Sequence, residues 1–85
     1  MAERTADEVA ELFRTAGDSV TVINGNKAEW QTDTEWKEEL QRNVFHLETI
    51  KSYKKEDRTT SIWTSEDFTA QDAAVTSGKS KIAAL

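Results

Sequence analysis

Apolar residues recur at helical spacing near the start of the chain, where they form one stripe of four: Val9, Leu12, Phe13 and Ala16. Thr5 and Glu8 have the spacing of a capping box, which satisfies free amide groups at the start of a helix. Gly17 follows the stripe at a position where glycine commonly ends a helix. This pattern predicts a helix over residues 6–16.

The next segment has the composition of a β-hairpin. Asn24, Gly25 and Asn26 are turn-forming residues between two short runs that are rich in strand-forming residues. A two-residue loop would mix apolar and charged side chains on one face of the hairpin. A three-residue loop instead turns four apolar side chains to the same face: Val20, Val22, Ala28 and Trp30. Because the apolar pattern decides strand register, we predict a hairpin over residues 19–31 with this face inward.

A long amphipathic helix is predicted over residues 33–52. Thr32 and Glu35 form a second possible capping box, with Asp33 as the alternative cap. At 100° per residue, one arc of the helix carries the large apolar side chains Trp36, Leu40, Val44, Leu47 and Ile50. Phe45 breaks the pattern, since it falls on the opposite, polar face.

A last helix is predicted over residues 65–77. Thr64 or Ser65 caps its start, and Gly78 marks its end. The residues after it, 79–85, form a short tail that is either flexible or docks on the core through Ile82 and Leu85.

Together these elements predict a small α+β fold in a single domain over residues 1–85. A two-stranded hairpin is only marginally stable by itself in water, so we expect it to pack on the long helix. The predicted core contains Val9, Leu12, Phe13, Val20, Val22, Trp30, Trp36, Leu40, Val44, Leu47, Ile50 and Phe68.

The composition offers few groups for catalysis. The 85 residues include no cysteine and one histidine, His46, so the usual pairs of nucleophile and base cannot be assembled. The same shortage argues against a zinc site. The three glycines are isolated, and none belongs to a phosphate-binding loop. We therefore predict a protein that is not an enzyme and has no metal and no cofactor.

Charge and hydropathy narrow the class of partner. The formal net charge is −5, which disfavours nucleic acid, because phosphate contacts require clustered cations. The one basic cluster, Lys51, Lys54, Lys55 and Arg58, is interrupted by Glu56 and Asp57. No apolar run approaches the ~18 residues of a membrane span, and no signal-peptide core is present. We expect a location in a virion or a host cytoplasm, with neither secretion nor membrane insertion.

The aromatic residues suggest contact with other proteins. A core of this size would be strained by burying six large rings, so one or two should be available to a partner. Trp63 either closes the core as a lid or is one of these, and Phe45 is either covered by the last helix or serves as an anchor. The candidate interface residues are Arg42, Phe45, Tyr53, Trp63, Ile82 and Leu85.

Two segments, "EWKEELQRNVFHLE" and "IWTSEDFTAQDAAVTSGK", resemble short uncharacterised proteins of tailed bacteriophages over about residues 29–79. The resemblance implies a virion-associated or assembly protein whose partners are virion proteins or copies of itself. The function expected is a non-enzymatic protein–protein interaction module, a structural component of a capsid or tail. The alternative is a small acidic regulator or inhibitor that binds a host protein through the acidic region 29–39.

Overall fold

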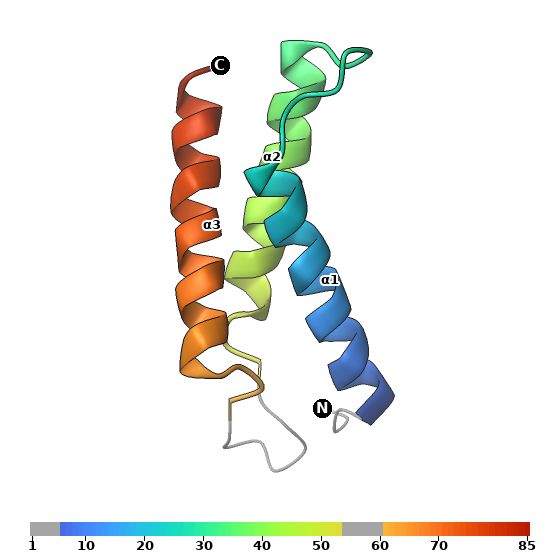
Figure 1. The fold of residues 1–85 in the computed structure, drawn as a ribbon, viewed down its shortest axis with the longest axis vertical. Coiled ribbons are helices and arrows are strands. Elements are labelled where there is room, and N and C mark those ends of the chain that lie inside the picture. Colours follow the sequence, from blue (N-terminus) through green and yellow to red (C-terminus); the bar gives the residue numbers. More distant parts are fainter. Residues whose placement is uncertain (1–5, 54–60) are drawn as a thin grey trace.

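The computed structural model describes residues 6–53 and 61–85, and within these ranges the chain forms three helices and no strand. The helices are α1 (Ala6–Asn24), α2 (Asp33–Ile50) and α3 (Ser65–Ala83). Figure 1 shows α1 and α3 running in the same direction, with α2 antiparallel to both. The fold is therefore a three-helix bundle, and the predicted α+β class is wrong.

The predicted hairpin is wrong because α1 continues through Gly17 to Asn24. The buried residues of α1 are Ala16, Ser19 and Ile23, spaced three and four apart, as on one face of a helix. Packing of this face outweighs the strand propensity of the β-branched run that surrounds Ile23. Gly25, rather than Gly17, follows the end of the helix, and its amide donates to the Val22 carbonyl at 3.1 Å.

The long helix was predicted correctly. The Thr32 hydroxyl accepts from the Glu35 amide at 3.1 Å, and the Glu35 carboxylate accepts from the Thr32 amide at 2.9 Å. This confirms the capping box at the start of α2. The whole predicted stripe of α2 is buried: Trp36, Leu40, Val44, Leu47 and Ile50. The capping box predicted at Thr5 lies outside the described residues.

The start of α3 was also predicted correctly, but its end was not. Thr64 caps the helix, with Asp67 completing a capping box. The helix does not stop at Gly78 but runs to Ala83, so most of the predicted tail belongs to α3. Gly78 is buried against the other two helices, since a Cβ built there would meet both Val44 and Ile23.

The core lies between the three helices and is closed at one end by Ile62 and Trp63, which precede α3. Five predicted core residues are only partly buried and pack against the core from outside: Val9, Leu12, Val20, Val22 and Phe68. A sixth, Phe13, is exposed. Trp30 was wrongly placed in the core, because its side chain is 76% exposed. It lies in the connector between α1 and α2, within a turn closed by the Gln31 amide and the Ala28 carbonyl at 3.0 Å.

Lys81 joins the third helix to the end of the first. Its ammonium group donates to the carbonyls of Ile23 and Gly25, at 2.5 and 2.9 Å. Carbonyls in the last turn of a helix lack partners within the helix, and a cation there also complements the helix dipole. The carboxyl end of α1 is therefore held by a side chain from α3.

Candidate protein-interaction groove

The candidate interface residues predicted from the sequence do not form one surface. Arg42 and Phe45 lie together on the outer face of α2, and the Phe45 side chain is 71% exposed. The last helix therefore does not cover Phe45. Leu85 is exposed beyond the end of α3, whereas Tyr53 lies just beyond the end of α2, at the opposite end of the bundle (Figure 1). Tyr53 and Ile82 are half-buried and pack against the core.

Trp63 is not an exposed anchor, since its side chain is 5% exposed. Its indole N–H donates to the Ile50 carbonyl at 2.7 Å, at the end of α2. Its ring also packs against Phe13, with centroids 4.9 Å apart and planes tilted by 59°. Trp63 thus acts as the lid of the core, which was the alternative to exposure.

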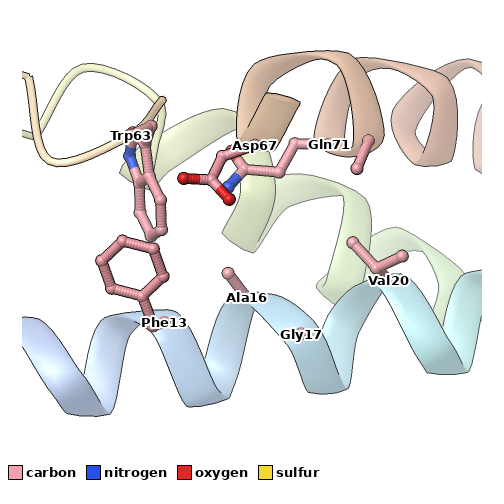
Figure 2. Close-up of a pocket in the computed structure, with 8 residues that line it drawn as sticks. Phe13, Ala16, Gly17, Val20, Trp63, Asp67 and Gln71 are labelled. Carbon is pink, nitrogen blue, oxygen red and sulfur yellow. The ribbon is translucent and has the colours of Figure 1, made fainter. Parts of the chain in front are cut away.

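A groove opens between α1 and α3, beside the Phe13–Trp63 pair. Its volume is about 200 Å³, and Figure 2 shows the side chains that line it. The lining residues are Phe13, Ala16, Gly17, Val20, Trp63, Asp67, Ala70 and Gln71. Figure 1 shows why space remains there: α1 diverges from α3 toward its amino-terminal end.

Small residues shape this groove. Ala16 and Gly17 lie on its α1 side, and Ala70 lies on its α3 side. A Cβ built on Gly17 would meet no atom within 4 Å, so the backbone of α1 is open to an approaching group at this point. Phe13 projects beside these small residues with 42% of its side chain exposed. The groove therefore combines a partly exposed ring with a smooth apolar floor.

Two polar side chains from α3 also line the groove. Gln71 is 5% exposed, and its carbonyl oxygen Oε1 is buried without a hydrogen-bond partner. Asp67 uses Oδ2 to accept from the Thr64 amide at 2.9 Å. Figure 2 shows both side chains reaching from α3 into the space above Ala16. The polar part of the groove thus presents hydrogen-bond acceptors.

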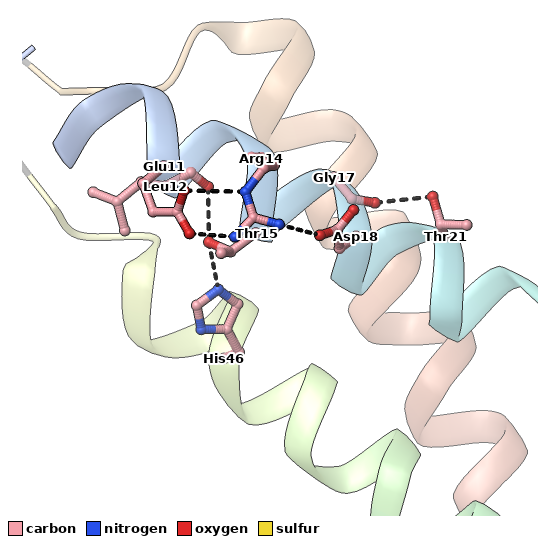
Figure 3. A network of polar contacts seen from close by, with 8 residues as sticks. All are labelled: Glu11, Leu12, Arg14, Thr15, Gly17, Asp18, Thr21 and His46. Atoms are coloured by element: carbon pink, nitrogen blue, oxygen red, sulfur yellow. Dashed lines mark hydrogen bonds and ion pairs between the residues drawn. The ribbon is translucent and has the colours of Figure 1, made fainter. Parts of the chain in front are cut away.

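A polar network lies on the neighbouring face of α1 (Figure 3). Arg14 pairs with Glu11 and, at 3.0 Å, with Asp18. The hydrogen bond from Arg14 and the guanidinium charge lower the pKa of Glu11, while the same contacts raise the pKa of Arg14. Both side chains are exposed, so this network orients charges on the surface and adds little stability.

His46 joins α2 to α1 through a hydrogen bond between Nε2 and the Thr15 hydroxyl, at 3.2 Å (Figure 3). Among the described residues, no group of three or more histidine, cysteine, aspartate or glutamate side chains could hold a metal ion. Of the basic cluster identified in the sequence, only Lys51 is described, and it pairs with Asp72 at 2.9 Å. Lys54, Lys55 and Arg58 lie outside the described residues.

Sequence reasoning missed this groove because it assigned its parts to other roles. Phe13 was assigned to the core, Gly17 to a helix end, and Gln71 and Asp67 to no site. The sequence carried no clear signal for the groove, because Gly17 and Ala70 lie at exposed positions of their helices and not on the buried face of the bundle.

No protein-family model matches this chain, and comparisons with curated proteins and with solved structures find no match either. None of the helices within residues 6–53 and 61–85 is long and apolar enough to cross a lipid bilayer.

Proposed function

We propose that this protein is a non-enzymatic protein–protein interaction module that receives a helix of its partner in the groove between α1 and α3. The observation that carries the proposal is the partly exposed Phe13 ring beside an open floor of Ala16, Gly17 and Ala70. A partner helix in this groove would complete a four-helix arrangement.

The dimensions of helix packing support this mode of binding. Packed helices lie about 8–10 Å apart, and small residues at the contact allow the shortest separations. Gly17 and Ala70 leave room for side chains of an incoming helix, while Phe13 offers it an aromatic contact. Aromatic residues near small pockets often contribute most of the affinity of an interface.

Phe45 and Trp30 support contact with more than one neighbour. Their side chains are 71% and 76% exposed, on the outer face of α2 and in the connector after α1. Two such sites away from the groove would suit a component that repeats in an assembly. That the assembly is a phage particle, with virion proteins or copies of this chain as partners, stays a prediction from the resemblance described above.

A second candidate is a small acidic regulator of another protein, and one observation favours it. The net charge of −5 is accompanied by acidic side chains on the first turns of α2: Asp33, Glu35, Glu38 and Glu39. Such a surface would steer a basic partner toward the protein. In this reading the free protein is a monomer, whereas a structural component would self-associate or join a large assembly.

Site-specific photocrosslinking would test the use of the groove. A photoreactive amino acid with a short aliphatic diazirine side chain, much smaller than an aromatic ring, replaces Gly17 in the full chain, and the matched control carries it at Gln41, on the exposed face of α2. We expect a discrete adduct in cells from position 17, and we expect Phe13→Ala to weaken it. An adduct of twice the protein's mass identifies a second copy, and any other mass identifies a different protein. Absence of an adduct from position 17 contradicts the proposal.

A further inference from the structure

We propose that the groove between α1 and α3 binds a basic amphipathic helix, and that an arginine or lysine of this helix places its cationic end beside Asp67 and Gln71. This inference rests on the proposed function and names the chemistry of the partner. The partner is defined by its charge and by the apolar stem that carries the charge.

The polar side chains that line the groove carry hydrogen-bond acceptors. Gln71 is 5% exposed, and its Oε1 has no hydrogen-bond donor. Buried polar atoms are nearly always paired, so Oε1 of this groove-lining residue would gain from a donor, either a water molecule or a side chain of a partner, that reaches it through the groove. Asp67 lines the same groove, and its carboxylate has a second oxygen besides the one engaged in the capping box. Both groups accept hydrogen bonds, and arginine and lysine side chains only donate them.

Two aromatic rings lie at one end of the groove. Phe13 and Trp63 form the end of the groove, with their ring centroids 4.9 Å apart. Aromatic faces attract cations, and the attraction increases where water is excluded. A guanidinium or ammonium group near these rings would thus meet favourable electrostatics from the rings as well as from Asp67.

The carboxylate of Asp67 has no positively charged neighbour among the described residues that line the groove. Among the described residues that line the groove, none is a lysine or an arginine. Arg14, on the neighbouring face of α1, is already paired with Glu11 and Asp18. Lys81 is occupied at the far end of α1 by two backbone carbonyls. Among the described residues, Asp67 forms no ion pair, so its charge is open to a cationic group of a partner.

The size of the groove suits a single side chain of a partner. The groove holds about 200 Å³, whereas pockets for drug-sized ligands span about 300–1,000 Å³. One long side chain suits this space better than a whole small molecule. The methylene stem of an arginine or lysine would lie along Ala16 and Val20, as such stems commonly cover apolar surface while the charged end reaches polar groups. The rest of the helix would rest on Gly17 and Ala70.

The test uses two synthetic amphipathic helical peptides of about 18 residues, with alanine and leucine on one face, lysine and glutamine on the other, and one central arginine on the apolar face. The second peptide carries citrulline in place of this arginine, which keeps the shape and removes the charge. Each is titrated into the isotope-labelled full chain, and the NMR signals of the Gln71 side-chain amide and the Trp63 indole N–H are followed.

We expect the arginine peptide to bind about tenfold more tightly than the citrulline peptide, with both signals shifting. Gln71→Met removes the acceptor and keeps an unbranched side chain of similar length. It should abolish most of the preference for the arginine peptide. Gly17→Trp should block both peptides, whereas Gln41→Trp, on the exposed face of α2, should block neither. Increasing ionic strength should weaken the binding of the arginine peptide more than the binding of the citrulline peptide.

Equal binding of the two peptides in the groove would overturn the inference of a cationic partner and leave the proposed interaction module standing. Failure of both peptides to shift the two signals would also overturn the inference. Photocrosslinking at position 17 then decides separately whether the groove is used at all. A crosslinked second copy, together with no preference for arginine, would identify self-association and reject the basic helix.

Discussion

Gly78 of α3 faces Val44 of α2 so closely that a Cβ built on the glycine would lie 2.5 Å from the valine Cγ2 atom. The same Cβ would lie 3.2 Å from Cγ2 of Ile23 in α1. All three helices thus meet at one residue that has no side chain. A glycine inside a helix costs about 1 kcal/mol relative to alanine, and here the close approach offsets that cost.

Gly78→Ala should destabilise the protein by about 1–2 kcal/mol, because the strain of overpacking exceeds the gain in helix propensity. Urea unfolding followed by circular dichroism measures the change. Val44→Ala in the same chain creates room for the new methyl group, so the double variant should lose less than the sum of the two single variants, by about 1 kcal/mol. If the losses in unfolding free energy of the two single variants simply add in the double variant, the contact between Gly78 and Val44 does not limit the packing.

Gly17→Ala should have the opposite effect. Gly17 lies within α1 with open space around the position of a Cβ, so alanine gains helix propensity without a clash. We expect stabilisation of about 0.5–1 kcal/mol. Thermal unfolding of this variant, measured beside Gly78→Ala, compares the same substitution in two helices. Destabilisation by Gly17→Ala would contradict the helical assignment of this segment.

Lys81→Met should destabilise the bundle by about 1–2 kcal/mol, because the carbonyls of Ile23 and Gly25 lose a charged donor. Methionine keeps most of the apolar stem, so the effect reports the ammonium group. Lys79→Met is the matched control, since Lys79 makes only an exposed ion pair with Glu48. Hydrogen exchange should show faster opening of the last turn of α1 in Lys81→Met alone.

The three tryptophans should differ in their access to a quencher. Trp30 is 76% exposed, while Trp36 and Trp63 are 7% and 5% exposed. Acrylamide should therefore quench one emission component strongly, and Trp30→Phe should remove that component. Trp63→Phe is the comparison: it should keep the quenchable component and destabilise the fold by about 1–2 kcal/mol, since the Ile50 carbonyl loses one of its two donors and the core loses part of a large ring.

The capping box of α2 should make stability depend on pH. The backbone hydrogen bond from Thr32, and then the one with its hydroxyl, lower the pKa of Glu35. Because the folded-state pKa is below the unfolded one, this contribution is fully present above the ordinary glutamate pKa. It is lost as the pH falls through the lowered pKa. Glu35→Gln should flatten this part of the profile of unfolding free energy against pH, because the amide does not titrate.

The parts of the fold that could be predicted are those where local signals agree. In α2 a capping box precedes a stripe of large apolar residues, and both signals lead to the same helix. The start of α3 was predictable for the same reason, because Thr64 and Asp67 repeat the cap spacing. These features depend on contacts within a few residues of sequence.

The second half of α1 could not be predicted because local and tertiary preferences conflict there. The β-branched residues around Ile23 and the following Asn24-Gly25 pair favour a strand and a turn. Ile23 is instead fully buried between helices, next to Gly78 from the far end of the chain. No local pattern reveals that a glycine in α3 opens this space, so Gly78 was mistaken for a helix end.

The candidate groove depends on the same long-range geometry. Phe13 was expected in the core because it shares a helical stripe with Leu12 and Ala16, but α1 diverges from α3 at this level (Figure 1). The angle between two helices depends on packing along their whole length, which a pattern of residues does not contain. Phe45, whose stripe was clearly polar, was correctly expected to break the pattern of its helix.

The ammonium group of Lys81 lies 58 residues along the chain from the carbonyl of Ile23 that it holds. During synthesis, α1 leaves the ribosome long before Lys81 has been added. The last turn of α1 therefore stays exposed to water until α3 is present to supply Lys81. Such long-range closure slows folding relative to purely local contacts, and this contact of the bundle forms only once all three helices are present.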